Sequence, residues 1–144
     1  MKIDDLNKKG KILMEKLRLS TYPLAIKMIK SEKEIPKDAY RPLKDSGYHL
    51  DVCQGFAKSR WEGKTVAMLK EDMWCFETVI GYGLAKAPED FIKGYNRYPE
   101  CALTEEAGIR GAEVVPRFEL NKYIGVVSAP LNSCNFEPDL CIIS

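Results

Sequence analysis

The segment 51–84 constrains the fold most, because it predicts a helix, a strand and a second helix in close succession. Asp51 is a favourable N-cap, and Gln54 three residues later is its reciprocal partner in a capping box. Gly63 is suited to end this first helix. Residues 64–69 then predict a strand that is apolar enough at its end for burial on both faces.

Each of the two predicted helices carries a cysteine in its first turn. Cys53 takes the second position of the first helix, and Asp72 is expected to cap a second helix over 73–84, which places Cys75 at its third position. Unpaired N–H groups and the helix dipole favour a thiolate there. We therefore take both cysteines as candidate ligand-binding and metal-binding residues, for zinc, an iron–sulfur centre or another redox ligand. The alternative is structural, since free cysteines are often buried and inert.

The rest of the chain alternates helices and strands without a strict βαβ rhythm. Hydrophobic periodicity predicts helices over 3–18 and 104–113, and strands over 24–29, 122–128 and 139–143. Gly10 lies on the apolar stripe of the first helix, where it permits close packing. The expected fold class is α/β or α+β, with a mixed β-sheet and helices packed on it. We expect one globular domain over 1–144, which could be incomplete at its C-terminus.

Composition argues against several classes of partner. A net charge of +1 gives no general attraction to nucleic acid or to a membrane surface, and no apolar run is long enough to span a bilayer. The first eleven residues are polar and charged, unlike a signal peptide. Five cysteines without a regular framework favour free or metal-bound thiols in a reducing cytoplasm.

Three further residues are candidates beside the cysteine pair. His49, the single histidine, precedes Cys53 by four residues, where it could activate that thiol or complete a metal site; the alternative is an exposed loop residue. Arg60 belongs to a basic helix edge that could bind an anion or simply be solvated. Cys134 lies in a segment of turn-forming residues, Asn132-Ser133-Cys134-Asn135, which could present its thiol to solvent. It is the weakest of the metal candidates.

An ordered series of short patterns covers nearly the whole chain. They are Pro23-Leu24-Ala25-Ile26-Lys27, Cys53-Gln54 followed by Ala57 and Arg60, Cys75 leading to Gly83-Leu84, Pro88 with Gly94, Ala129-Pro130-Leu131, and Phe136-Glu137-Pro138-Asp139. On these residues the chain resembles the bacterial and archaeal family catalogued as domain of unknown function 169. The resemblance implies no established activity, because the family is uncharacterised, and it points to Cys53 and Cys75 as the first positions to test.

The chain departs from that family pattern at two places. Family members commonly continue past the last strand, so this chain, ending at Ser144, is interpreted as a short or truncated member. Phe76 and Glu77 are bulky or charged where small residues are expected after Cys75, which argues against a cofactor that must approach that turn closely.

The sequence thus leaves three functions open. The first is a cytoplasmic protein that binds a metal, an iron–sulfur centre or a small ligand near Cys53 and Cys75. The second is a non-catalytic interaction or structural domain with inert cysteines. The third is a thiol-dependent enzyme that uses Cys53 with His49. A homo-oligomer is compatible with each of them.

Overall fold

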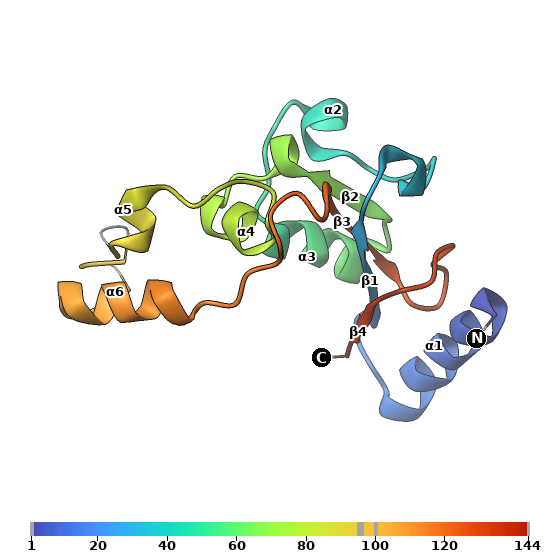
Figure 1. Cartoon of the computed structure of the whole chain (residues 1–144). Coiled ribbons are helices and arrows are strands. Elements are labelled where there is room, and N and C mark those ends of the chain that lie inside the picture. The colour runs from blue at the N-terminus through green and yellow to red at the C-terminus, as the bar shows by residue number, and fades with distance from the viewer. Residues whose placement is uncertain (1, 95–96, 100, 144) are drawn as a thin grey trace. The chain divides into compact units, whose positions relative to one another are not determined.

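The computed structural model describes residues 2–94, 97–99 and 101–143, and the chain divides into two compact units (Figure 1). One unit comprises Met1–Phe76 with Tyr123–Ser144, and the other comprises Glu77–Lys122. The expectation of a single domain over the whole chain stays a prediction.

A four-stranded sheet forms the centre of the first unit. Its strands are β1 (Leu24–Ile29), β2 (Val66–Leu69), β3 (Gly125–Pro130) and β4 (Leu140–Ile142), in the order β2-β3-β1-β4. The ladders between these strands are all antiparallel. With helices packed on the sheet the fold is α+β, so the predicted class is confirmed, while the strands pair antiparallel instead of forming a mixed sheet.

Small residues let α3 (Val52–Glu62) lie close to one face of the sheet (Figure 1). Ser59 Oγ of α3 lies 2.7 Å from Ser128 Oγ of β3. One turn earlier, a Cβ atom on Gly55 would lie 2.3 Å from Sδ of Met68 in β2, so a side chain at this position would displace that sulfur. The face of α3 that carries Gly55 and Ser59 therefore packs on the sheet. The adjacent face of the same helix is directed toward β1 and β4.

The opposite face of the sheet carries the main hydrophobic core of this unit. Strand alternation places Ala67, Val127 and Ala129 on this face, and Leu6 of α1 (Ile3–Leu17) joins them in one buried cluster. A Cβ on Gly10 would lie 2.8 Å from the backbone N of Asn132. The predicted first helix, and the close packing that its glycine permits, are both confirmed.

The two edges of the sheet differ. The segment around Tyr40 covers the β2 edge, where Tyr40 N donates to Thr65 O at 2.8 Å and Ala67 N donates to Tyr40 O at 3.0 Å. This segment lies between a 3₁₀ turn (Glu32–Glu34) and α2 (Pro42–Ser46). Within the described residues, the outer side of β4 has no such cover.

The helix expected over 73–84 is wrong in its first turn. Asp72 is fully buried, where its carboxylate accepts a 2.9 Å hydrogen bond from Leu69 N and a 2.8 Å bond from Arg41 Nε. Since these donors hold the carboxylate, it does not cap a helix at residue 73. A 3₁₀ turn (Lys70–Asp72) forms instead, and α4 (Phe76–Gly81) begins only after Cys75.

The second unit contains α5 (Glu89–Ile92) and α6 (Glu105–Val114). Thr104 Oγ1 accepts a hydrogen bond from Ala107 N at 3.1 Å and caps α6, so the helix start predicted at residue 104 is confirmed. Gly83 has φ +66°, and a Cβ there would lie 2.5 Å from the carbonyl oxygen of Glu119. This glycine therefore admits a second backbone segment close to its own backbone.

Candidate functional site

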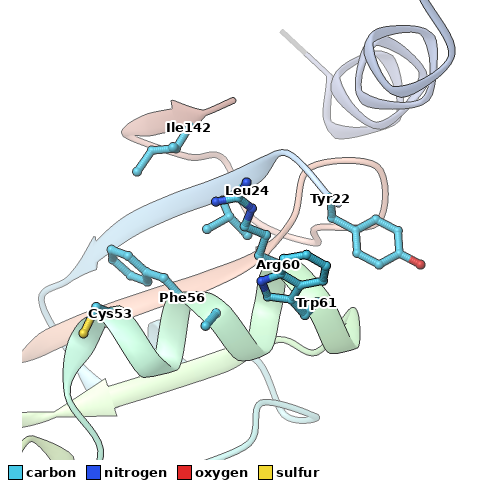
Figure 2. A pocket seen from close by; sticks show the side chains of 8 residues that line it. Tyr22, Leu24, Cys53, Phe56, Arg60, Trp61 and Ile142 are labelled. Atoms are coloured by element: carbon cyan, nitrogen blue, oxygen red, sulfur yellow. The ribbon is translucent and has the colours of Figure 1, made fainter. Parts of the chain in front are cut away.

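A groove of about 210 Å³ lies between α3 and the β1–β4 side of the sheet (Figure 2). From α3 it is lined by Cys53, Phe56, Ala57 and Arg60, which follow the i, i+3, i+4, i+7 spacing of one helix face, and by Trp61 beside them. The facing wall consists of Tyr22, Leu24 of β1 and Ile142 of β4. None of these lining residues is acidic.

Arg60 brings the positive charge of the groove. Its Nε donates to Thr21 Oγ1 at 2.8 Å, and its carbonyl oxygen accepts from Tyr22 N at 3.1 Å. Figure 2 shows the Arg60 side chain extending from α3 toward Leu24, and the Trp61 side chain next to it on the same helix. Because Thr21 is buried, this hydrogen bond fixes the orientation of the guanidinium group at the end of the groove.

Cys53 lies at the other end of the same helix face and is exposed. The predicted start of its helix is confirmed, since α3 begins at Val52 and Gln54 Oε1 accepts a hydrogen bond from Asp51 N at 2.8 Å. The structure thus places two of the predicted site residues, Cys53 and Arg60, in one groove.

Cys75 and His49 are not among the residues that line this groove. The segments before the two cysteines do run side by side, because Leu50 N donates to Asp72 O at 3.0 Å and Trp74 N donates to Leu50 O at 3.0 Å. His49 is exposed there, with its ring 6.2 Å from the ring of Trp74. Cys75 is half-buried and lies directly before α4, so it does not take the third helical position that the sequence predicted for it.

The described residues contain no group of three or more His, Cys, Asp or Glu side chains that could hold a metal ion. Cys134, the third metal candidate, is 1% exposed, and the prediction that its turn presents the thiol to solvent is wrong. Its Sγ donates to Asn7 Oδ1 at 3.4 Å, and Asn7 Nδ2 donates to Cys134 O at 3.1 Å. Burial raises the pKa of this thiol. Cys134 therefore joins α1 to the chain after β3.

Within this helix face, Phe56 is half-buried and Ala57 is exposed in the groove, while Val52 and Gly55 are buried. The signal that could have identified the buried face is the pair Gly55 and Ser59, since small residues one turn apart permit close helix–sheet packing. Tyr22, Leu24 and Ile142 carry no comparable signal, because only the Tyr22 N to Arg60 O hydrogen bond and the pairing of Leu24 with Ile142 bring them to α3.

In the described part of the chain, no helix is both long enough and apolar enough to cross a membrane. The family described as uncharacterised ArCR, domain of unknown function 169, matches residues 12–144. An uncharacterized protein of Methanocaldococcus jannaschii, MJ0308, is 26% identical over 141 residues, which cover 96% of this chain and 58% of that protein. No solved structure matches the chain significantly. Since the family match spans most of the sequence, this chain belongs to the domain of unknown function 169 family.

Proposed function

We propose that the chain is a small-ligand-binding protein whose site is the groove between α3 and the β1–β4 side of the sheet. One observation carries the proposal: a continuous helix face, Cys53 to Arg60, lies opposite Leu24 and Ile142 across an open groove. Most of the wall is apolar or aromatic and a single cation lies at one end, which is the usual composition of small-molecule sites. The free cysteines of the chain suit a reducing compartment, and we propose the cytoplasm.

The volume limits the size of the ligand. A cavity of about 150 Å³ accommodates benzene. A groove of about 210 Å³ therefore fits one ring or a short chain with a small substituent, and it does not enclose a dinucleotide or a flavin. Cys53 and Arg60 are seven residues apart on α3, which is about 10 Å along the helix axis. The ligand would lie along α3 between them.

The walls favour a flat, partly apolar ligand with a negative group. Phe56, Trp61 and Tyr22 offer aromatic surfaces, and such rings stack on planar apolar groups. The Arg60 guanidinium is suited to a carboxylate or phosphate, because its planar donors match two oxygens at once. With no acidic side chain in the lining, an anion at that end meets no repulsion from the groove. An aromatic or short aliphatic carboxylate is the ligand class that fits both features.

The proposal is tested by NMR titration of the ¹⁵N-labelled protein with phenylacetate and with phenylacetamide. We expect phenylacetate to shift the amide signals of α3 and β4, and to slow the reaction of Cys53 with a thiol reagent. The neutral amide should bind at least several-fold more weakly, since it cannot form a charge-assisted bond with Arg60.

Substitutions at Ala57 provide the matched controls. Ala57→Leu fills the groove from an exposed position and should abolish these shifts, whereas Ala57→Ser keeps the groove open and should leave them unchanged. Equal binding by both variants, or shifts confined to other regions, would contradict the proposal.

A zinc or iron–sulfur site at Cys53 and Cys75 stays a separate proposal, which needs donors from outside the described residues or from another subunit. Metal analysis of protein purified without oxygen, beside its Cys53→Ser/Cys75→Ser variant, distinguishes the two. Stoichiometric metal that disappears in the variant would favour the metal site. Metal-free protein of unchanged stability would leave the groove as the site.

A further inference from the structure

We propose that the open edge of β4 pairs with the same edge of a second copy of this chain, in an antiparallel dimer with Cys141 at the twofold axis. The inference is independent of ligand binding in the groove. It rests on the difference between the two edges of the sheet, on the residues that β4 exposes, and on the place of Cys141 within the strand.

The two edges of the sheet are treated differently by the fold. At β2 the backbone groups next to Val66 are satisfied by Tyr40, through bonds of 2.8 Å and 3.0 Å. At β4 one side pairs with β1, and among the described residues no segment pairs with the other side. Exposed edge strands present unpaired N–H and C=O groups, which readily pair with another chain.

β4 also lacks the residues that usually protect an edge. Leu140, Ile142 and Ile143 are 55%, 37% and 46% exposed, and the segment 140–143 contains no charged residue and no proline. Natural edges are commonly protected by lysine, proline, inward charges or a very short strand, and of these β4 has the short length, three residues. Pairing between two copies would cover apolar side chains without setting like charges opposite each other.

A twofold axis fixes the register of such a pair. In β4, Cys141 is the central residue and pairs with Ala25 of β1, with Leu140 and Ile142 on either side of it. If the axis passes beside Cys141, each Leu140 lies opposite Ile142 of the other copy, and the two Cys141 residues lie opposite each other. Residues directly opposite in an antiparallel pair have Cα atoms about 4.5–5.5 Å apart. Disulfides span this distance.

Asp139, the acidic residue next to β4, would not cause charge repulsion in this dimer. Asp139 would face Ile143 of the other copy, not a second carboxylate. Its own carboxylate accepts a hydrogen bond from Met28 N at 2.8 Å, and Asp139 N donates to Ile26 O at 2.8 Å, so this residue is already held against β1. Because β4 is short, the interface would be small, and the dimer is expected to be weak.

Sedimentation velocity of the reduced full chain tests the proposal over concentrations from about 1 μM to about 1 mM, where small interfaces associate. We expect a monomer–dimer equilibrium that Leu140→Lys weakens at least tenfold, since two lysines would enter the paired edge. Leu17→Lys is the matched control, because Leu17 is 54% exposed on α1, against 55% for Leu140. It should leave the equilibrium unchanged.

Oxidation supplies a second readout of the register. Diamide takes up the two electrons and two protons that are released when two thiols join, and it should give a covalent dimer that Cys141→Ser abolishes. That variant keeps the exposed Cys53 and Cys101 as internal controls. A chain that stays monomeric throughout the concentration range would overturn the proposal. So would a dimer that Leu140→Lys leaves intact, or a disulfide dimer that persists in Cys141→Ser.

Discussion

Ser59 Oγ of α3 and Ser128 Oγ of β3 lie 2.7 Å apart, and both side chains are buried. Ser59 Oγ also lies 3.1 Å from the carbonyl oxygen of Ser128. A hydroxyl pair at the centre of a helix–sheet interface sets both the distance and the rotation of the helix, because buried hydroxyl groups must keep their partners. This contact turns Cys53, Phe56, Ala57 and Arg60 toward the groove.

Ser59→Ala and Ser128→Ala should each lower the free energy of unfolding by about 1–2 kcal/mol, since each leaves a buried hydroxyl group short of a partner. The double variant should lose clearly less than the sum of the two, because it removes both hydroxyls together. Urea unfolding of the four proteins measures the coupling. Additive losses would show that the two hydroxyls do not interact.

Asp72→Asn should lower the free energy of unfolding by about 3–5 kcal/mol, the usual effect of removing one partner from a buried ion pair. The carboxylate of Asp72 is fully buried and lies 2.7 Å from Arg41 Nη2, so its loss leaves that guanidinium group without its closest counter-charge. The control is Glu71→Gln, which removes the negative charge of a 57% exposed carboxylate beside the same arginine. It should change stability by less than about 1 kcal/mol. Equal effects in thermal unfolding would contradict the buried role of Asp72.

Gly10→Ala and Gly111→Ala should change stability in opposite directions. A Cβ at residue 10 meets the backbone N of Asn132 at 2.8 Å, so alanine must push α1 away from the sheet. At residue 111, within α6, the nearest atom, on the Arg97 side chain, is 3.7 Å away, an ordinary contact. There alanine should add about 0.5–1 kcal/mol through its helix propensity. Calorimetric unfolding of both variants checks the signs, and a gain at residue 10 would contradict the packing of α1 described here.

Stability should fall at alkaline pH through Cys134. Burial raises the pKa of this thiol above its ordinary value of 9.0, so the unfolded chain loses the proton at lower pH than the folded chain does. The stabilisation is therefore fully present below pH 9.0 and declines as the pH rises through the folded value.

The Cys134→Ala variant isolates this effect, because it shares every other titrating group with the wild type. The stability advantage of the wild type over this variant, measured by denaturant unfolding, should be smaller at about pH 10 than at pH 7. If this stability advantage stays constant or grows over the pH range, the pKa of the Cys134 thiol is not raised in the folded protein.

The sequence by itself determined the local elements. The periodicity of 3–18, the capping pair Asp51 and Gln54, and the apolar run 64–69 predicted α1, α3 and β2 with nearly correct bounds, since these signals depend on neighbours in the chain. Thr104 predicted the start of α6 for the same reason. The family, and a fold class of α/β or α+β, also followed from patterns within the sequence.

Only the tertiary structure decided which residues meet. Aspartate is a residue type that often caps helices, but the carboxylate of Asp72 is bound by Arg41, which is distant in sequence. The helix start predicted at residue 73 and the helical position predicted for Cys75 were therefore wrong. Cys134 is buried because Asn7 of α1 packs on it. The groove exists because β4 pairs with β1 beside α3, and a contact between segments more than eighty residues apart leaves no pattern in either segment alone.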